Sequence, residues 1–143
     1  MSIAIRAIQP DDAAAVNLLS AQLGYPHPVA ETLTRINHML LNENDHLLVA
    51  ADGAAVIGWM HVYKTMWLES GVFAEIAALV VDEQHRGKGA GELLVEAAKV
   101  WCMDQGCPRL KVRSNVVRAR AHQFYRKAGF KETKESKVFE MHL

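Results

Sequence analysis

The chain has 143 residues, of which 50% are hydrophobic and 22% are charged. This composition is typical of one folded globular domain and excludes a disordered, coiled-coil or collagen-like protein. Sixteen basic residues balance sixteen acidic ones, which argues against a protein that coats nucleic acid or an anionic membrane. The charges are nevertheless unevenly distributed along the chain. Residues 1–83 hold three basic and ten acidic residues, whereas residues 84–143 hold thirteen basic and six acidic ones.

No targeting signal or membrane span is visible in the sequence. The first residues lack the charged region and apolar core of a signal peptide, and no apolar run approaches the 18 or so residues of a span. Cys102 and Cys107 match neither a CxxC redox pair nor a zinc-ligand spacing, so both are predicted to be reduced and structural. We expect a single domain over residues 1–143 and a cytoplasmic location.

The first forty residues predict a strand followed by two helices. Residues 3–8 alternate in part between apolar and polar side chains. Pro10 and the two aspartates after it mark the start of a helix. Apolar residues then recur at intervals of three and four over residues 29–40, which indicates a second, amphipathic helix.

The middle of the chain predicts a hairpin and a central strand. Asp52-Gly53 is a dipeptide favoured in tight turns, so residues 46–51 and 54–65 are expected to pair antiparallel. Residues 72–82 are almost continuously apolar and rich in β-branched side chains, which is typical of a strand buried on both faces. Glu75 is the one charge inside this strand before its final aspartate.

The last third predicts two helices and three strands. A helix over residues 89–105 is followed by a strand over residues 109–114. A second helix over residues 117–128 ends at a glycine placed for a left-handed cap. Two short strands, over residues 130–134 and 137–142, are expected to complete the fold. The apolar face of the first helix is predicted to consist of Leu93, Leu94, Ala97, Ala98 and Trp101.

A glycine-rich turn, Gln-His-Arg-Gly-Lys-Gly-Ala-Gly, joins the central strand to the helix after it over residues 84–91. Glycines let a backbone approach a ligand closely, and the amides at a helix start attract anions. A phosphate-binding turn is one interpretation, and a merely tight connection is the other. The P-loop pattern is absent, and GxGxxG fails because Glu92 replaces its third glycine, which disfavours a nucleotide-binding loop of either kind.

Gln84-x-x-Gly87-x-Gly89 after a buried strand resembles the first motif of the GNAT superfamily of acetyl-CoA-dependent N-acetyltransferases. Residues 114–130, SNVVRARAHQFYRKAGF, resemble the later family motif in which a helix carries Phe-Tyr and ends at Gly-Phe. The motif is nearest to aminoalkylphosphonate and aminoglycoside N-acetyltransferases. The resemblance implies an α/β fold of order β-α-α-β-β-β-α-β-α-β-β, with a mixed, mostly antiparallel sheet of six to seven strands and about four helices.

The resemblance also implies a site for acetyl-CoA. In the family, the glycine-rich turn binds the pyrophosphate of CoA through its amides, and pantetheine enters where the central strand diverges from its parallel neighbour. Asn115 corresponds to an asparagine that hydrogen-bonds the pantetheine arm, although a turn-forming role fits this residue equally. The residues carried over as cofactor-binding are Leu79, Val80, Val81, Gln84, Arg86, Gly87, Lys88, Gly89, Ala90, Gly91 and Asn115.

Two residues are candidates for catalysis. Glu75 stands where several family members place a glutamate base, which is needed because a free alkylammonium is mostly protonated at neutral pH. Glu75 fits equally an ion pair or a contact to a cationic substrate. Tyr125 occupies the family's general-acid position, although its spacing on the helix also fits a core residue.

The acceptor is expected to be a small-molecule amine, with a protein amino group or a silent acyl-CoA-binding module as alternatives. Two loops would frame its site, with Tyr25, His27, Trp67 and Glu69 as candidate contacts. Tyr63 fits either the core or a pocket wall. The seven histidines show no ligand spacing, so no metal is expected. Neither nucleic acid nor membrane is an expected partner, and a homodimer stays open. The basic half is expected to face CoA and the acidic half a cationic amine.

Overall fold

The computed structural model describes residues 2–113 and 119–143. It contains two compact units, one ending at Val112 and one beginning at Arg113, and each is described by itself. None of the helices described is long and apolar enough to cross a membrane.

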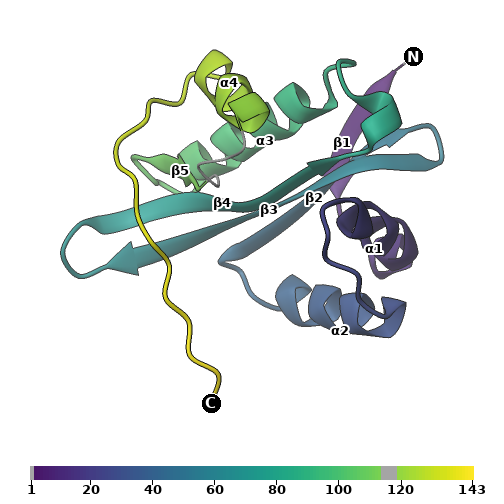
Figure 1. The fold of residues 1–143 in the computed structure, drawn as a ribbon, viewed down its shortest axis with the longest axis horizontal. Helices are drawn as coiled ribbons and strands as arrows, with labels where there is room; N and C mark the ends of the chain where they lie inside the picture. The colour runs from purple at the N-terminus through teal and green to yellow at the C-terminus, as the bar shows by residue number, and fades with distance from the viewer. Residues whose placement is uncertain (1, 114–118) are drawn as a thin grey trace. The chain divides into compact units, whose positions relative to one another are not determined.

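The first unit is built on a five-stranded sheet with the order β1-β2-β3-β4-β5 (Figure 1). The strands β1 to β4 pair antiparallel in sequence, and β5 pairs parallel with β4. The predicted hairpin is confirmed, with Gly53-Ala54 as its two loop residues and Gly53 at φ +60°. The strands are β1 (Ile3–Ala7), β2 (Asp45–Asp52), β3 (Ala55–Trp67), β4 (Gly71–Val81) and β5 (Leu110–Val112).

Helices cover the two faces of this sheet. Figure 1 shows α1 (Ala13–Gln22) and α2 (Val29–Leu40) on one face and α3 (Ala90–Asp104) on the other. Two short 3₁₀ turns, η1 (Pro10–Asp12) and η2 (Glu83–His85), precede α1 and α3. Apolar side chains of β2, of the first two helices and of the residue that follows β1 form a cluster on the α1–α2 face. Its buried members are Ile8, Ala13, Val16, Ile36, Leu47 and Val49.

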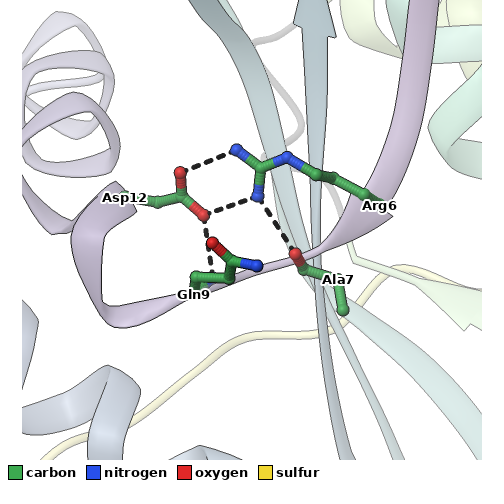
Figure 2. Close-up of polar contacts among 4 residues, drawn as sticks. All are labelled: Arg6, Ala7, Gln9 and Asp12. Atoms are coloured by element: carbon green, nitrogen blue, oxygen red, sulfur yellow. Dashed lines mark hydrogen bonds and ion pairs between the residues drawn. The ribbon is translucent and has the colours of Figure 1, made fainter. Parts of the chain in front are cut away.

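An ion pair between a partly exposed arginine and a buried aspartate fixes the junction between β1 and α1. Figure 2 shows Arg6 reaching both carboxylate oxygens of Asp12, at 2.8 and 2.9 Å, while the Gln9 amide donates to the same carboxylate at 2.8 Å. The Arg6 hydrogen bonds hold the pKa of Asp12 below its ordinary value. The aspartate therefore supplies an acceptor for a backbone amide at the start of the helical segment.

The third helix turns a slightly different face to the sheet than its spacing predicts. Leu94 and Ala98 are fully buried as expected, but Leu93 is 43% exposed. The buried row also includes Ala90, Val95 and Cys102. Sequence spacing predicts which residues form the apolar face of a helix but not which of them lie at its centre. Leu93 and Leu94 are adjacent and differ by about 100° around the helix axis, so only one of them can point directly at the sheet.

The second unit contains α4 (Ala119–Lys127), and Gly129 follows it at φ +105° as a left-handed cap. The predicted strands over residues 130–134 and 137–142 do not form. Phe139 and Met141 are 89% and 79% exposed. Because a strand needs a second backbone to pair its amides and carbonyls, β-favouring side chains alone do not create one. The described sheet therefore has five strands rather than six or seven, and the element order is confirmed only as far as α4.

Candidate active site

The glycine-rich turn needs glycine for its backbone conformation. Gly87 and Gly89 have φ values of +80° and +91°, in the left-handed region that other residues rarely adopt. A Cβ built on either residue meets no atom of the described residues within 4 Å, so crowding among them is not the reason for glycine. The tight-connection interpretation therefore explains these two glycines by itself, and any ligand role depends on what surrounds them.

The surroundings of this turn suit an anion. Gly89, the N-cap of α3, has no side chain that could cap the helix, and none of the hydrogen bonds of the described residues caps it from elsewhere. The first amides of a helix have no partner inside it. Gln84, Arg86 and Lys88 are exposed, and within the described parts of the chain neither cation forms an ion pair. Open amides, a helix dipole and two unpaired cations are the features that hold a phosphate or pyrophosphate.

The residues before the turn are tied to α1. Asp82 accepts hydrogen bonds from Gln22 at 3.1 Å and from His85 at 2.7 Å, and these contacts lower the pKa of Asp82. The Glu83 amide donates to the Gln22 side chain at 3.2 Å. Gln22 is a contributor that sequence reasoning missed, since its partners stand sixty residues away and no local pattern marks it.

One edge of β4 is open beyond its pairing with β5. The parallel pairing covers only Ala74–Ile76, so the next five residues of β4 have no partner on that side among the described strands. Along an antiparallel pair of strands, every second residue hydrogen-bonds to the neighbouring strand. The Asp82 amide donates to the Ile57 carbonyl of β3 at 2.8 Å, so Val80, two residues earlier, also faces β3. The residues between them and before them, Val81 and Leu79, therefore point their amides and carbonyls toward the open edge.

Glu75 lies in β4 just before this open edge and is 7% exposed. The Tyr63 hydroxyl, on the neighbouring strand β3, donates to Glu75 Oε2 at 2.5 Å. Next to Tyr63 on the same strand face, the His61 ring lies 5.8 Å away and is itself 2.8 Å from Asp45. The hydrogen bond satisfies a buried carboxylate and fixes its orientation. Tyr63 is a site residue that the sequence left open, and only the β3–β4 register identifies it.

Cations and aromatic rings meet beside Glu75. Lys111 is the register partner of Glu75 on β5, and its ammonium lies 4.3 Å from the ring centre of Phe73 and 4.8 Å from that of Trp67. The two rings pack edge to face at 5.0 Å. Arg109 lies over the Phe73 ring at 5.5 Å and donates to the Ser70 carbonyl at 3.0 Å. These contacts join β5 to the end of the β3–β4 hairpin.

This arrangement corrects the expected separation of charge. Lys111 and Arg109 belong to the basic half of the chain, yet both contact Phe73 of the acidic half, and Lys111 is the register partner of Glu75. The two signs are therefore mixed on this face of the sheet, because parallel pairing brings β5 next to β4 whatever charge each carries.

The four predicted acceptor contacts fall in two places. Trp67 and Glu69 line an open depression at the β3–β4 turn together with Met66 and Leu68. Tyr25 is 58% exposed in the connection between α1 and α2, and His27 there lies 3.6 Å from Glu31. Within the described residues, no hydrogen bond, ion pair or ring contact links Tyr25 or His27 to Glu75 or Trp67.

The remaining predicted residues belong to other parts of the chain. Ala90 and Gly91 are buried in the first turn of α3. Tyr125 lies on α4, where its ring contacts Phe124 at 5.3 Å and Phe130 at 5.7 Å. Asn115 lies outside the described residues. Among the residues described, no group of three or more His, Cys, Asp or Glu side chains could hold a metal ion.

Comparison with known proteins identifies relatives over most of the chain. The sequence profile of the acetyltransferase (GNAT) family matches residues 11–130. Aminoglycoside N(6')-acetyltransferase type 1 of Stenotrophomonas maltophilia is 32% identical over 97% of this chain and 93% of its own length. Aminoalkylphosphonate N-acetyltransferase of Salmonella typhimurium is 28% identical over 66% of this chain and 62% of its own length.

Solved structures share the fold at lower identity. A transcriptional regulator from Bacillus halodurans superposes with a TM-score of 0.88 at 23% identity, over 99% of this chain and 100% of the other. The acetyltransferase AAC(6')-Iy, solved with a bisubstrate analogue that contains CoA, superposes with a TM-score of 0.86 at 17% identity, over 100% of both chains.

Proposed function

The chain belongs to the GNAT family of acetyltransferases and is an acetyl-CoA-dependent N-acetyltransferase, and we propose that its acceptor is the primary amine of a small molecule. The relatives named for aminoglycosides and aminoalkylphosphonates support this class of acceptor. The proposal assigns the glycine-rich turn to the pyrophosphate of CoA and the open edge of β4, at Leu79 and Val81, to the pantetheine arm.

The observation that carries the proposal is the position of Glu75. Its carboxylate is buried, held by Tyr63, and stands in the strand whose open edge begins two residues later. A carboxylate in this place can take a proton from an ammonium group that arrives beside the thioester. Removing the proton exposes the nitrogen lone pair, which a protonated amine cannot use for attack.

Acetyl-CoA supplies a thioester whose acetyl group passes to the amine while the CoA thiol leaves. In this proposal, Glu75 accepts one proton from the ammonium, and the neutral nitrogen forms the new C–N bond. The C–S bond then breaks, and the Tyr125 hydroxyl donates a proton to the departing sulfur. Acetylation also releases the second amine proton, and that proton restores the tyrosine through solvent, so atoms and charge balance.

A thiol-release assay with acetyl-CoA tests the proposal against small amines and short peptides. Glu75→Gln is expected to lower turnover at neutral pH by about tenfold or more while acetyl-CoA binding persists. Glu96→Gln is the matched control, because Glu96 is an exposed carboxylate on α3. Turnover with peptides alone would favour a protein acceptor. Tight acetyl-CoA binding without released thiol for any amine would favour a silent module and overturn the proposal.

The role of Tyr125 has its own test. Tyr125→Phe is expected to keep the ring contacts to Phe124 and Phe130 and to lose most of the rate. Full activity of this variant would remove Tyr125 from the role of general acid.

A further inference from the structure

Lys111 is a cation held beside Glu75 without a carboxylate partner. Its ammonium lies over the rings of Phe73 and Trp67, at 4.3 and 4.8 Å from their centres. No carboxylate of the described residues lies within ion-pair distance of it. An aromatic face attracts the charge of an ammonium but leaves its three N–H donors without acceptors.

The strand register places this cation next to the proposed base. Lys111 and Glu75 are direct partners in the parallel β4–β5 pairing, and paired residues of neighbouring strands rise from the same sheet face about 4.8 Å apart. Phe73, two residues before Glu75, lies on that face as well, and its contact with the ammonium confirms where Lys111 points. One sheet face therefore presents a carboxylate and an unpaired ammonium side by side.

Other charges on this face already have partners. Glu75 accepts from Tyr63, and Asp45 lies 2.8 Å from His61. Arg109 adds a second positive charge over the Phe73 ring while its guanidinium donates to the Ser70 carbonyl. Lys111 is therefore the group on this face that a ligand can engage through a charge-assisted hydrogen bond without first breaking an ion pair described here.

On the basis of the proposed function, we infer that the acceptor is a zwitterion. It is a primary amine that also carries an acidic group, either a phosphonate or a carboxylate, on a short linker. The amine lies at Glu75 and the acidic group lies at Lys111, with Arg109 adding to the positive potential. A polycationic acceptor is disfavoured at this position, because Lys111 and Arg109 would repel its further ammonium groups.

The test compares acceptors that differ only in the second group. Thiol release is measured with 2-aminoethylphosphonate, β-alanine, ethanolamine and putrescine, which pair one primary amine with a phosphonate, a carboxylate, a hydroxyl and a second amine. The wild-type protein is expected to show a kcat/KM at least about tenfold higher for an anionic acceptor than for ethanolamine. The ratio of the phosphonate to the carboxylate identifies which acid the site prefers.

Variants locate the preference. Lys111→Met keeps the apolar stem on the two rings and removes the charge. The preference for anionic over neutral acceptors is therefore expected to fall about tenfold, mainly through a higher KM for the anionic acceptors. Lys111→Arg is expected to retain the preference. Lys99→Met, on the exposed side of α3, is the matched control and should behave as wild type.

Several results would overturn the inference. These are equal use of anionic and neutral acceptors, a preference for putrescine over both acids, or an equal loss for every acceptor in Lys111→Met. A titration of 2-aminoethylphosphonate into the CoA-saturated protein separates this inference from the proposed function. Binding that Lys111→Met abolishes, without acetylation, would refute the function and support the anion site. Acetylation of ethanolamine with no binding preference for the phosphonate would support the proposed function and refute the anion site.

Discussion

Replacing Tyr63 with phenylalanine should lower the catalytic efficiency by releasing the carboxylate of Glu75. The Tyr63 phenol donates a hydrogen bond of 2.5 Å to this carboxylate, which is only 7% exposed. The ring stays in place in Tyr63→Phe, so the change removes a donor without opening a cavity. A carboxylate that loses this donor is no longer held in one orientation toward the acceptor amine.

The size of the loss follows from the strength of that contact. A hydrogen bond to a charged group contributes about 1.5 to 3 kcal/mol, and about 1.36 kcal/mol on the activation barrier corresponds to a tenfold change in rate. The value of kcat/KM should therefore fall by about tenfold to a hundredfold. Because Tyr63 is half-buried and water can replace part of the contact, we expect the lower end of that range.

The assay is thiol release measured with the same acceptor and the same buffer for wild type and variant. Tyr25→Phe removes a hydroxyl from an exposed residue in the α1–α2 connection and is the control. Because Tyr25 is a candidate acceptor contact, this control is compared by kcat at saturating acceptor, which should not change. If Tyr63→Phe keeps the kcat/KM of wild type while Glu75→Gln lowers turnover, then Tyr63 does not position the base.

Three further predictions concern stability, conformation and reactivity. Asp12→Asn should lower the free energy of unfolding by about 1 to 3 kcal/mol. Because Arg6 depresses the pKa of Asp12 in the folded protein, the difference in stability between wild type and variant, measured by urea unfolding, should be complete above about pH 4 and shrink as the pH falls further. A difference that grows in acid would refute this reasoning. Gly89→Ala should cost about 1 to 2 kcal/mol of stability because its φ is +91°, and acetyl-CoA affinity measured in parallel should fall; unchanged stability would show that the turn tolerates a side chain. Burial and the neighbouring Cys107 raise the pKa of Cys102 to about 11, so alkylation at pH 8, followed by mass spectrometry, should be slow in the native protein and fast in urea; rapid native labelling would contradict its burial.

Local patterns determined most elements of the first unit. Alternation, turn dipeptides and intervals of three and four act over a few residues, so the β2–β3 hairpin, α2 and the strand around Glu75 are predictable without any partner. The glycine-rich turn is equally local, since the positive φ of Gly87 and Gly89 is a property of the backbone at those residues. The family resemblance of residues 84–91 and 114–130 rests on the same short-range motifs.

Tertiary structure decided which residues meet. The two strands expected after α4 do not form, because a strand depends on a partner backbone that the tail itself does not supply. Tyr63 meets Glu75, and Lys111 stands beside it, only because the register of β3, β4 and β5 aligns residues 12 and 36 positions away. The sequence by itself determined the elements and the chemistry they carry. The pairing of distant strands determined the neighbours of the carboxylate, because register is set by the packing of whole sheet faces rather than by any local pattern.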